Sequence, residues 1–445
     1  MENKFNKILK SGIFSSANDA VLLAAGAYKR YTKLSLNERQ EIIDEIKAKL
    51  LYRIKEIAQM TVDETGMGNV NDKIKKLFWA ITKTPGTEDL ITEVKTGDNG
   101  MTLYELSSYG VICSILPCTN PCATLISNTI GMLAAGNSII YCPHPRAINV
   151  SKYVTEIINM AIRDKCGIDN LVVTLNESSI SSTTEIITHP DVSMVVCTGG
   201  MGVLKRAMSC GKKVIGAGPA NPVSIVDETA KIDKAARDIV KGASFDNNLM
   251  CISEKCIVAV SIIADELMTE LIKDDVYYVK DPVEMVKLTK AAITSDMKFK
   301  KSLEGKSADE ILKAAGIYTD KKFKLIVVEC IKEHPFVTNE MLMPMVPLVK
   351  VDNFEEALDT ALEIEQGYRH TASIHSQSIE RLNRAAKVMQ TSVFVKNGAS
   401  LVGIGVNGEG DASFTIATAT GEGTTTARHF ARRRRCSLTN GFSIR

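Results

Sequence analysis

Hydrophobic residues along this chain follow three patterns, and each pattern predicts a different kind of element. From Ser35 to Ile57 apolar residues recur at helical spacing, and Ser35 with Glu38 has the spacing of a capping box. From Met101 to Ser108 apolar and polar residues alternate weakly, which indicates a hairpin or an exposed ribbon. Further along, short and wholly apolar runs such as "GVICSIL", "NSIIYC", "NLVVTL" and "SMVVCTGG" alternate with helical segments. Such runs are typical of strands that are buried on both faces of a parallel sheet.

The alternation of apolar strands and helices occurs twice, before and after Cys251. The second series contains "KCIVAV", "KLIVVEC", "MVPLVKV", "TASIHS" and "TSVFVKN". Because helices between parallel strands imply right-handed crossovers, the sequence predicts two doubly wound α/β domains. From Asn397 the chain is rich in Gly and Thr, which is typical of a functional loop or an arm onto a neighbouring subunit. The predicted helices include residues 123–135, 148–165, 264–272, 354–365 and 379–389.

Charge and composition exclude several classes of protein. The 445 residues carry 54 Lys and Arg against 52 Asp and Glu, so no overall field attracts nucleic acid or a membrane. No stretch approaches the roughly 20 apolar residues of a membrane span, and the first residues lack the apolar segment of a secretion signal. We therefore expect a cytosolic protein. The basic run Arg432–Arg435 is interpreted as a solvated face or a subunit contact, not as a nucleic-acid site.

Cysteine and histidine spacing predicts no metal site. The chain has eleven cysteines, without a CxxC pair, and no histidine stands at ligand spacing beside Cys118 and Cys122 or beside Cys251 and Cys256. The six histidines form no HExxH motif. In a large cytosolic chain this pattern indicates reduced, mainly structural thiols.

Three local motifs have both a chemical and a structural interpretation. Cys251, in "FDNNLMCISEK", is a buried core thiol, a metal ligand or a nucleophile. Gly199 and Gly200 follow a strand and precede a helix, which suits either a nucleotide pyrophosphate or an ordinary turn. Asn120, held by Pro121, either donates its amide to an oxyanion or simply forms a turn. Viewed singly, each motif favours its structural interpretation.

Seven co-linear motifs together change that balance. They are "SYGVICSILPCTNP", "AAGNSIIYCPHPRA", "CTGGMG", "FDNNLMCISEK", "EHPFVTNEMLMPMVPLVKV", "TSVFVKN" and "TATGEGTTTARHFARRRRC". This set resembles the aldehyde dehydrogenase superfamily. More narrowly, it resembles the CoA-acylating branch, the propanediol- and ethanolamine-utilisation aldehyde dehydrogenases of bacterial microcompartments. The resemblance runs from about Gly12 to Arg445, essentially the whole chain.

The resemblance implies a mechanism and a set of site residues. Cys251 matches the nucleophile that attacks a short-chain aldehyde, propionaldehyde or acetaldehyde, and Asn120 matches the amide that stabilises the oxyanion together with the Cys251 N–H. Hydride passes to NAD, and CoA then removes the acyl group from Cys251 by a reversible ping-pong route. Glu340 matches the glutamate that holds the nicotinamide ribose. The implied cofactor-binding residues are Thr119, Pro143, His144, Pro145, Thr198, Gly199, Gly200, Gly216, Ala217, Gly218 and Glu340.

The runner-up activity is CoA-independent hydrolysis of the same thioester. A hydrolytic enzyme needs a carboxylate base to activate water, and in that branch a glutamate opens the motif that here reads "IGAGPANP". From Gly202 to Val226 the chain has no Asp or Glu, which favours CoA as the acyl acceptor. The other alternative is a weakly active scaffold member of the family.

The resemblance also implies a domain organisation and partners. Residues 1–227 are expected to form a Rossmann-like domain that binds NAD and CoA, and residues 228–425 the catalytic thiol domain. The ribbon at 95–110 and residues 426–445 are expected to form an oligomerisation arm of a homodimer or homotetramer. The implied location is the cytoplasm, or a bacterial microcompartment with shell or pathway enzymes as partners. Members of this branch often carry a targeting helix at the N-terminus, where this chain has "FNKILK".

Overall fold

The computed structural model describes residues 12–442 and residue 444, and it divides the chain into two compact units. Unit 1 comprises Met1–Glu64, Ile74–Ala217 and Asp411–Arg445. Unit 2 comprises Thr65–Lys73 and Gly218–Gly410. The N-terminal segment "FNKILK" lies outside the described residues.

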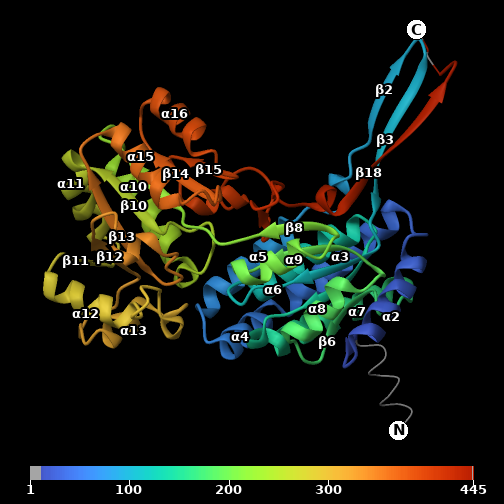
Figure 1. The fold of residues 1–445 in the computed structure, drawn as a ribbon, viewed down its shortest axis with the longest axis horizontal. Coiled ribbons are helices and arrows are strands. Elements are labelled where there is room, and N and C mark those ends of the chain that lie inside the picture. Colours follow the sequence, from blue (N-terminus) through green and yellow to red (C-terminus); the bar gives the residue numbers. More distant parts are fainter. Residues whose placement is uncertain (1–11, 443, 445) are drawn as a thin grey trace. The chain divides into compact units, whose positions relative to one another are not determined.

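Unit 1 is built on a six-stranded parallel sheet with the order β1-β6-β5-β4-β7-β8. Apolar side chains fill both faces of its central strands, as the apolar runs predict. The strands are β1 (Ile13–Phe14), β4 (Val111–Ile115), β5 (Ser138–Cys142), β6 (Val172–Leu175), β7 (Val192–Thr198) and β8 (Lys213–Ala217). The helices are α2 (Ala17–Tyr31), α3 (Leu36–Tyr52), α4 (Ile54–Thr65), α5 (Val70–Thr82), α6 (Pro121–Ala134), α7 (Ile148–Cys166), α8 (Ile180–Thr188) and α9 (Met201–Met208); the last residue of α4 and the first residues of α5 belong to unit 2 (Figure 1).

Unit 2 is built on a seven-stranded parallel sheet with the order β11-β12-β13-β10-β9-β14-β15. Its strands are β9 (Val223–Val226), β10 (Cys256–Val260), β11 (Val276–Val279), β12 (Leu325–Glu329), β13 (Met345–Val351), β14 (Thr371–His375) and β15 (Val393–Lys396). Its helices are α10 (Ile232–Ser244), α11 (Ser261–Ile272), α12 (Pro282–Ala292), α13 (Ala308–Ala314), α14 (Pro335–Thr338), α15 (Phe354–Glu365) and α16 (Ile379–Met389).

The central strand β10 shows why its sequence, "CIVAV", is wholly apolar. Ile257 and Ala259 pack with α10 and α11 on one face of the sheet. Cys256, Val258 and Val260 pack with α15 and α16 on the other face. Because successive side chains of a strand point to opposite faces, a strand covered on both faces has no place for a solvated residue.

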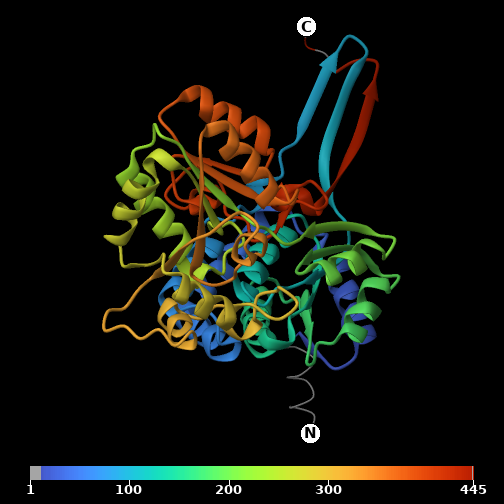
Figure 2. The ribbon, with the colours of Figure 1, turned by 60° about the vertical axis from the view of Figure 1, so that its left-hand side comes forward.

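The ribbon predicted near Met101 is part of a three-stranded antiparallel sheet in unit 1. Its strands are β2 (Glu93–Gly97), β3 (Gly100–Ser108) and β18 (Ala431–Thr439). β18 pairs with β3 from Ala431 opposite Ser108 to Thr439 opposite Gly100. Figures 1 and 2 show these three strands side by side as an extended ribbon. The predicted association of the two segments is confirmed, and the whole basic run lies on β18. The remaining strands, β16 (Ile416–Ala417) and β17 (Gly423–Thr424), form a short hairpin.

The apolar stripe from Ser35 to Ile57 proves to be two helices and not one. Ser35 caps α3 with the predicted capping box to Glu38, and Ile42, Ile43, Ile46 and Leu50 are buried. The helix then ends at Arg53, whose N–H bonds to the carbonyls of Leu50 and Leu51. The period of the stripe continues into α4, so the hydrophobic pattern alone does not reveal the break.

The units also divide the chain differently from the predicted domain boundaries. The boundary predicted after residue 227 lies instead between Ala217 and Gly218. Residues 65–73, expected in the first domain, belong to unit 2. Residues 411–425, expected in the catalytic domain, belong to unit 1, because Thr415 pairs with Asn128 and Thr420 with Gly216. Among residues 12–442 and 444, no helix is both long and apolar enough to span a bilayer.

Candidate functional site

In unit 2, Cys251 lies in a short connection between α10 and β10, residues Phe245–Lys255, here called the Cys251 turn. Asp246, Asn247 and Asn248 all adopt the left-handed backbone conformation, with φ of 48°, 53° and 58°. Only glycine enters this region without strain, and Asp and Asn tolerate it best among the other residues. The "DNN" of the motif is therefore the local sequence that permits the sharp turn before Cys251.

The strained backbone is held through the side chain of Asp246. Lys73 Nζ lies 2.8 Å from Asp246 Oδ2, and the two side chains are 2% and 0% exposed. The N–H of Asn69 donates to Asp246 Oδ1 at 3.3 Å, and the N–H of Asp246 donates to Asp72 Oδ2 at 3.0 Å. Asn247 Nδ2 donates to the carbonyl of Gly305 at 2.8 Å. The segment 65–73 thus fixes the turn from outside.

A second set of bonds closes the Cys251 turn on itself. Lys255 Nζ donates to both the carbonyl and Oδ1 of Asn248, each at 2.5 Å. Asn248 Nδ2 donates in return to the carbonyl of Glu254 at 3.0 Å. Burial lowers the pKa of Lys255, and the neighbouring charges of Glu340, Cys251 and Glu254 oppose that decrease. Lys255 is therefore a buried cation within electrostatic range of the partly exposed Cys251.

Glu254 is the buried carboxylate nearest to Cys251 in sequence, and both of its oxygens are bonded. The N–H of Ser400 donates to Oε1 at 2.7 Å and the Ser400 hydroxyl donates to Oε2 at 2.8 Å. The carboxylate also packs on Gly242 of α10, where an added Cβ would stand 2.0 Å from Oε2. Burial raises the pKa of Glu254 to about 7 although the Ser400 bonds lower it. Glu254 is accordingly a bracing group of the turn.

Glu340, predicted to hold the nicotinamide ribose, follows α14 and is partly buried. Its Oε2 accepts the N–H of Ala220 at 3.3 Å, in the "GPAN" segment that begins at Gly218. Burial raises the pKa of Glu340, and the neighbouring Lys255 lowers it. Glu340, Lys255 and Cys251 thus interact electrostatically within unit 2, and the Ala220 N–H donates to Glu340.

His370 is a residue near Lys255 that the sequence did not single out. It is 1% exposed, and its Nδ1 lies 2.8 Å from the Thr371 hydroxyl. Burial and the nearby Lys255 cation lower the pKa of His370 to about 4, so the ring is neutral at pH 7. An isolated histidine in "YRHTAS" offers no sequence pattern that would have distinguished it from the other histidines.

In unit 1, several of the predicted residues lie at the carboxyl ends of the parallel strands. The strand order reverses between β4 and β7, which are paired in parallel. Ligands of doubly wound sheets bind at the carboxyl ends of the strands at such a reversal. Asn120 follows β4, Gly199 and Gly200 follow β7, and His144 follows β5 on the other side of β4. The tertiary structure therefore unites three motifs that are widely spaced in the chain.

Asn120 is the N-terminal cap residue of α6 and is 8% exposed. Its Nδ2 donates to the hydroxyl of Thr119 at 3.3 Å. Its Oδ1 accepts from Lys76 Nζ at 2.5 Å, and Lys76 is itself 1% exposed. The amide orientation follows from this bond, because an ammonium group donates hydrogen bonds and cannot accept them. Lys76 was not among the residues predicted from the sequence.

The glycine turn after β7 has room beside it. A Cβ added at Gly199 or Gly200 would meet no atom within 4 Å, and Gly200 caps α9 without a side-chain hydrogen bond. The open backbone and the uncapped start of α9 suit a phosphate group. Thr198 is held differently, since its hydroxyl lies 3.1 Å from the hydroxyl of Thr415. Gly199 N–H donates to the carbonyl of Ala217 at 3.2 Å, which joins the two glycine segments.

The remaining predicted residues have structural explanations in this fold. A Cβ at Gly216 would lie 2.6 Å from Leu204 of α9, so glycine permits close packing there. His144 Nδ1 accepts the N–H of Arg146 at 3.1 Å and caps a single 3-10 turn after β5. Of its proline neighbours, Pro143 is buried and Pro145 is exposed. These contacts leave the cofactor roles of these residues as predictions.

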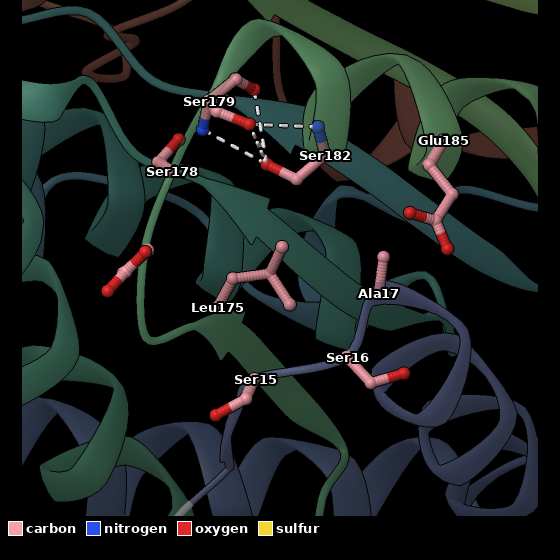
Figure 3. A pocket seen from close by; sticks show the side chains of 9 residues that line it. Ser15, Ser16, Ala17, Leu175, Ser178, Ser179, Ser182 and Glu185 are labelled. Carbon is pink, nitrogen blue, oxygen red and sulfur yellow. Dashed lines mark hydrogen bonds between the residues drawn. The ribbon is translucent and has the colours of Figure 1, made fainter.

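A cavity of about 320 Å³ lies elsewhere in unit 1, at the carboxyl end of β6. Figure 3 shows Leu175 at its base, with serines from the starts of α2 and α8 around it. Ser16 accepts the N–H of Asp19, and Ser179 and Ser182 form a capping box, so these hydroxyls serve to cap helices. None of the residues predicted for the coenzyme lines this cavity. Across the described part of the chain, no group of three or more His, Cys, Asp or Glu side chains could hold a metal ion.

Comparison with known proteins identifies the class to which this fold and site belong. The sequence profile of the Aldehyde dehydrogenase family matches residues 13–410, which is most of the chain. The chain therefore belongs to the aldehyde dehydrogenase family, as the seven motifs predict.

Three relatives define the neighbourhood within that family. The chain is 48% identical to the propanal dehydrogenase (CoA-propanoylating) of Salmonella typhimurium over 435 residues. This alignment covers 98% of this chain and 93% of that protein. The crystal structure of Rhodopseudomonas palustris propionaldehyde dehydrogenase, with bound CoA and an acylated cysteine, superposes with a TM-score of 0.96 at 45% identity and covers 98% of this chain and 100% of that one. The propionaldehyde dehydrogenase of the Clostridium phytofermentans fucose utilisation bacterial microcompartment superposes with a TM-score of 0.95 at 41% identity, with coverage of 98% and 100%. The predicted aldehyde dehydrogenase-like α/β fold is confirmed.

Proposed function

We propose that this protein is a CoA-acylating aldehyde dehydrogenase. It oxidises a short-chain aldehyde, propionaldehyde or acetaldehyde, with NAD and transfers the acyl group to CoA. The proposal is supported by the activity named for the relative that is 48% identical over nearly the whole chain. The observation that carries it within this molecule is the Cys251 turn, where a partly exposed thiol stands on a backbone braced by buried Lys73 and Lys255.

In the proposed mechanism Cys251 attacks the aldehyde carbon and forms a thiohemiacetal. The Asn120 amide and the Cys251 N–H donate to the oxygen on which negative charge develops. Glu340 would hold the nicotinamide ribose, and Thr198, Gly199 and Gly200 would receive the coenzyme phosphates at the start of α9. A bound nicotinamide coenzyme supplies the hydride acceptor. Cys251 is left as a thioester, and attack by the CoA thiol restores it.

The choice of CoA over water as acyl acceptor follows from the carboxylates of the chain. Hydrolysis requires a base, because water is weakly acidic and poorly nucleophilic without one. No Asp or Glu occurs from Gly202 to Val226. Near Cys251, both oxygens of Glu254 accept bonds from Ser400. A thiol needs less help to ionise than water, so CoA is the better acceptor at this site.

The test measures NADH formation from propionaldehyde and NAD with and without CoA. The proposal predicts sustained turnover only when CoA is present, and a loss of at least about 10³-fold in Cys251→Ala, because the nucleophile itself is removed. Cys166→Ala is the matched control, since Cys166 is a partly exposed thiol at the end of α7 and should leave turnover unchanged. Equal turnover without CoA would identify a hydrolytic enzyme. No turnover with several short aldehydes would favour a scaffold role.

We further infer that the three-stranded ribbon mediates assembly into a homodimer or homotetramer. The inference is supported by the exposed outer strands of this sheet, β18 and β2, since unpaired strand edges are ready to bind another chain. Residues Arg432–Arg435 are then part of a subunit contact. The microcompartment origin of one similar structure supports packaging with shell or pathway enzymes as the location. Sedimentation with purified microcompartments would support packaging, and recovery in the free cytoplasmic fraction alone would contradict it.

A further inference from the structure

We propose that Lys76 is a positioning residue for the oxyanion donor: it holds the side-chain oxygen of Asn120 so that the amide N–H group faces the reacting carbonyl. This inference rests on the proposed function, because it assigns a role to Asn120 in that reaction. Lys76 and Asn120 both belong to unit 1, and their contact is direct.

The backbone of Asn120 is already fixed without Lys76. Pro121 follows it and begins α6, and the Asn120 carbonyl accepts the N–H of Thr124 at 3.0 Å. Only the side-chain torsions of Asn120 then remain to be set. Lys76 sets them from the second turn of α5, where its Nζ lies 2.5 Å from Asn120 Oδ1.

The direction of the amide decides whether Asn120 helps or harms the reaction. The oxygen and the nitrogen of an amide side chain have nearly the same shape, so a half-turn about the last torsion exchanges them at little steric cost. In the reversed orientation a carbonyl oxygen would face the developing oxyanion and repel it. The ammonium of Lys76 excludes this orientation, because a group that only donates must face the oxygen.

The same contact leaves a donor for the substrate. The amide nitrogen of Asn120 carries two hydrogens, and the bond to the Thr119 hydroxyl at 3.3 Å uses one. The second N–H is then the donor to the oxyanion. A charged partner on the oxygen also polarises the amide, which makes its N–H a stronger donor in a buried site. Lys76 and Asn120 are 1% and 8% exposed, so water competes little for these bonds.

The experiment is a double-mutant cycle of Lys76→Met and Asn120→Ala, read as CoA-dependent NADH formation. Asn120→Ala should lower kcat by about 10²–10³-fold, the usual effect of removing one oxyanion donor. Lys76→Met should lower kcat by about 10–100-fold with little change in the aldehyde KM. In the Asn120→Ala background, Lys76→Met should have almost no further effect, because its action passes through the amide. Lys75→Met is the matched control, since Lys75 is an exposed neighbour on α5.

Two kinetic outcomes would overturn the proposal: an unchanged kcat in Lys76→Met, or losses that multiply in the double variant as expected of an unrelated structural role. If Lys76→Met does not fold, Asn120→Asp decides. The carboxylate keeps an acceptor for Lys76 but removes the N–H donor, so this variant should melt at or above Asn120→Ala while both are inactive. Melting below Asn120→Ala would refute the contact. A wild-type protein without CoA-dependent turnover would instead refute the proposed function, and the melting comparison would still test the contact.

Discussion

Replacing Lys73 by methionine should loosen the Cys251 turn while the sheet of unit 2 stays intact. The change keeps the length and the apolar stem of the side chain but removes the cation that lies 2.8 Å from Asp246 Oδ2. Asp246 would then be a carboxylate with 0% exposure and without its charged partner. The bond from the Asn69 N–H, at 3.3 Å, compensates only part of that loss.

The expected magnitude follows from the burial of the pair. Removing one partner of a buried ion pair costs about 3–5 kcal/mol, and the Asn69 bond places this case near the lower limit. The turn depends on its contacts, because each of its three left-handed residues costs roughly 1–2 kcal/mol. A loss of about 3 kcal/mol corresponds to an opening equilibrium about 10²-fold more favourable.

Amide hydrogen exchange measures this opening directly. The reporters are Leu249 N–H, bonded to the Asp246 carbonyl at 3.3 Å, and Ser253 N–H, bonded to the Met250 carbonyl at 3.1 Å. Their exchange should accelerate about 10²-fold in Lys73→Met, while the amides of β10 stay protected by β9 and β13. Lys75→Met, on the same helix and exposed, should change neither set.

The same variant should slow the chemical step. A mobile turn holds the Cys251 thiol in the reactive geometry for a smaller fraction of the time, so the first-turnover rate of NADH formation should fall. Unchanged exchange at Leu249 and Ser253 in a folded Lys73→Met protein would refute the argument that this ion pair restrains the turn. Loss of protection throughout β10 would show that the pair supports the whole unit.

Three further changes test other parts of the structure. Burial raises the pKa of Glu254 to about 7 from its ordinary value of 4.5. The native state therefore binds this proton more tightly than the unfolded chain does. The stabilisation from this proton is fully present below pH 4.5 and is lost as the pH rises through 7. Glu254→Gln should remove this pH-dependent loss. In urea unfolding, the free energy of unfolding of the variant relative to wild type should rise by roughly 3 kcal/mol between about pH 5 and pH 8. A difference between the two proteins that does not change with pH would contradict the assignment. Gly242→Ala places a Cβ 2.0 Å from Glu254 Oε2 and should cost about 1–3 kcal/mol, whereas Gly26→Ala, with no atom within 4 Å, should cost nothing; equal melting temperatures would refute the packing argument. Truncation after Ala427 removes β18 and should reduce the oligomer in sedimentation equilibrium; an unchanged oligomer would argue against the ribbon as a subunit contact.

The apolar pattern was enough to predict the two parallel sheets and several of their helices, among them α6, α7, α11, α15 and α16. Wholly apolar runs occur where a strand is covered on both faces, and β10 shows this in its alternate contacts with α10 and α15. Helices α15 and α16 have the predicted bounds, because Asn353 and Ser378 cap them at the start of clear apolar periods. The seven motifs were enough to identify the family. These features depend on neighbouring residues or on burial alone, so the linear pattern records them.

Other elements were not predicted from the sequence, among them α5 and α10 and a segment with a weak apolar pattern. The segment with β11, α12 and α13 was not predicted, and β11, "VYYV", is a short strand at the sheet edge whose two tyrosines are only partly buried. An edge strand is covered less completely, so its sequence differs less from that of a loop.

Only the tertiary structure decided which polar residues support the site. Lys73, Lys75 and Lys76 are alike in "DKIKKLF", yet the first and third are buried and the second is exposed. Lys73 and Lys76 stand in register with Leu77 and Ala80 on one helical stripe, which is the one signal in the sequence that a lysine there faces the interior. Their partners lie 173 and 44 residues further along the chain. A buried cation is stable only beside a specific acceptor, and the fold, not the local sequence, brings that acceptor into place.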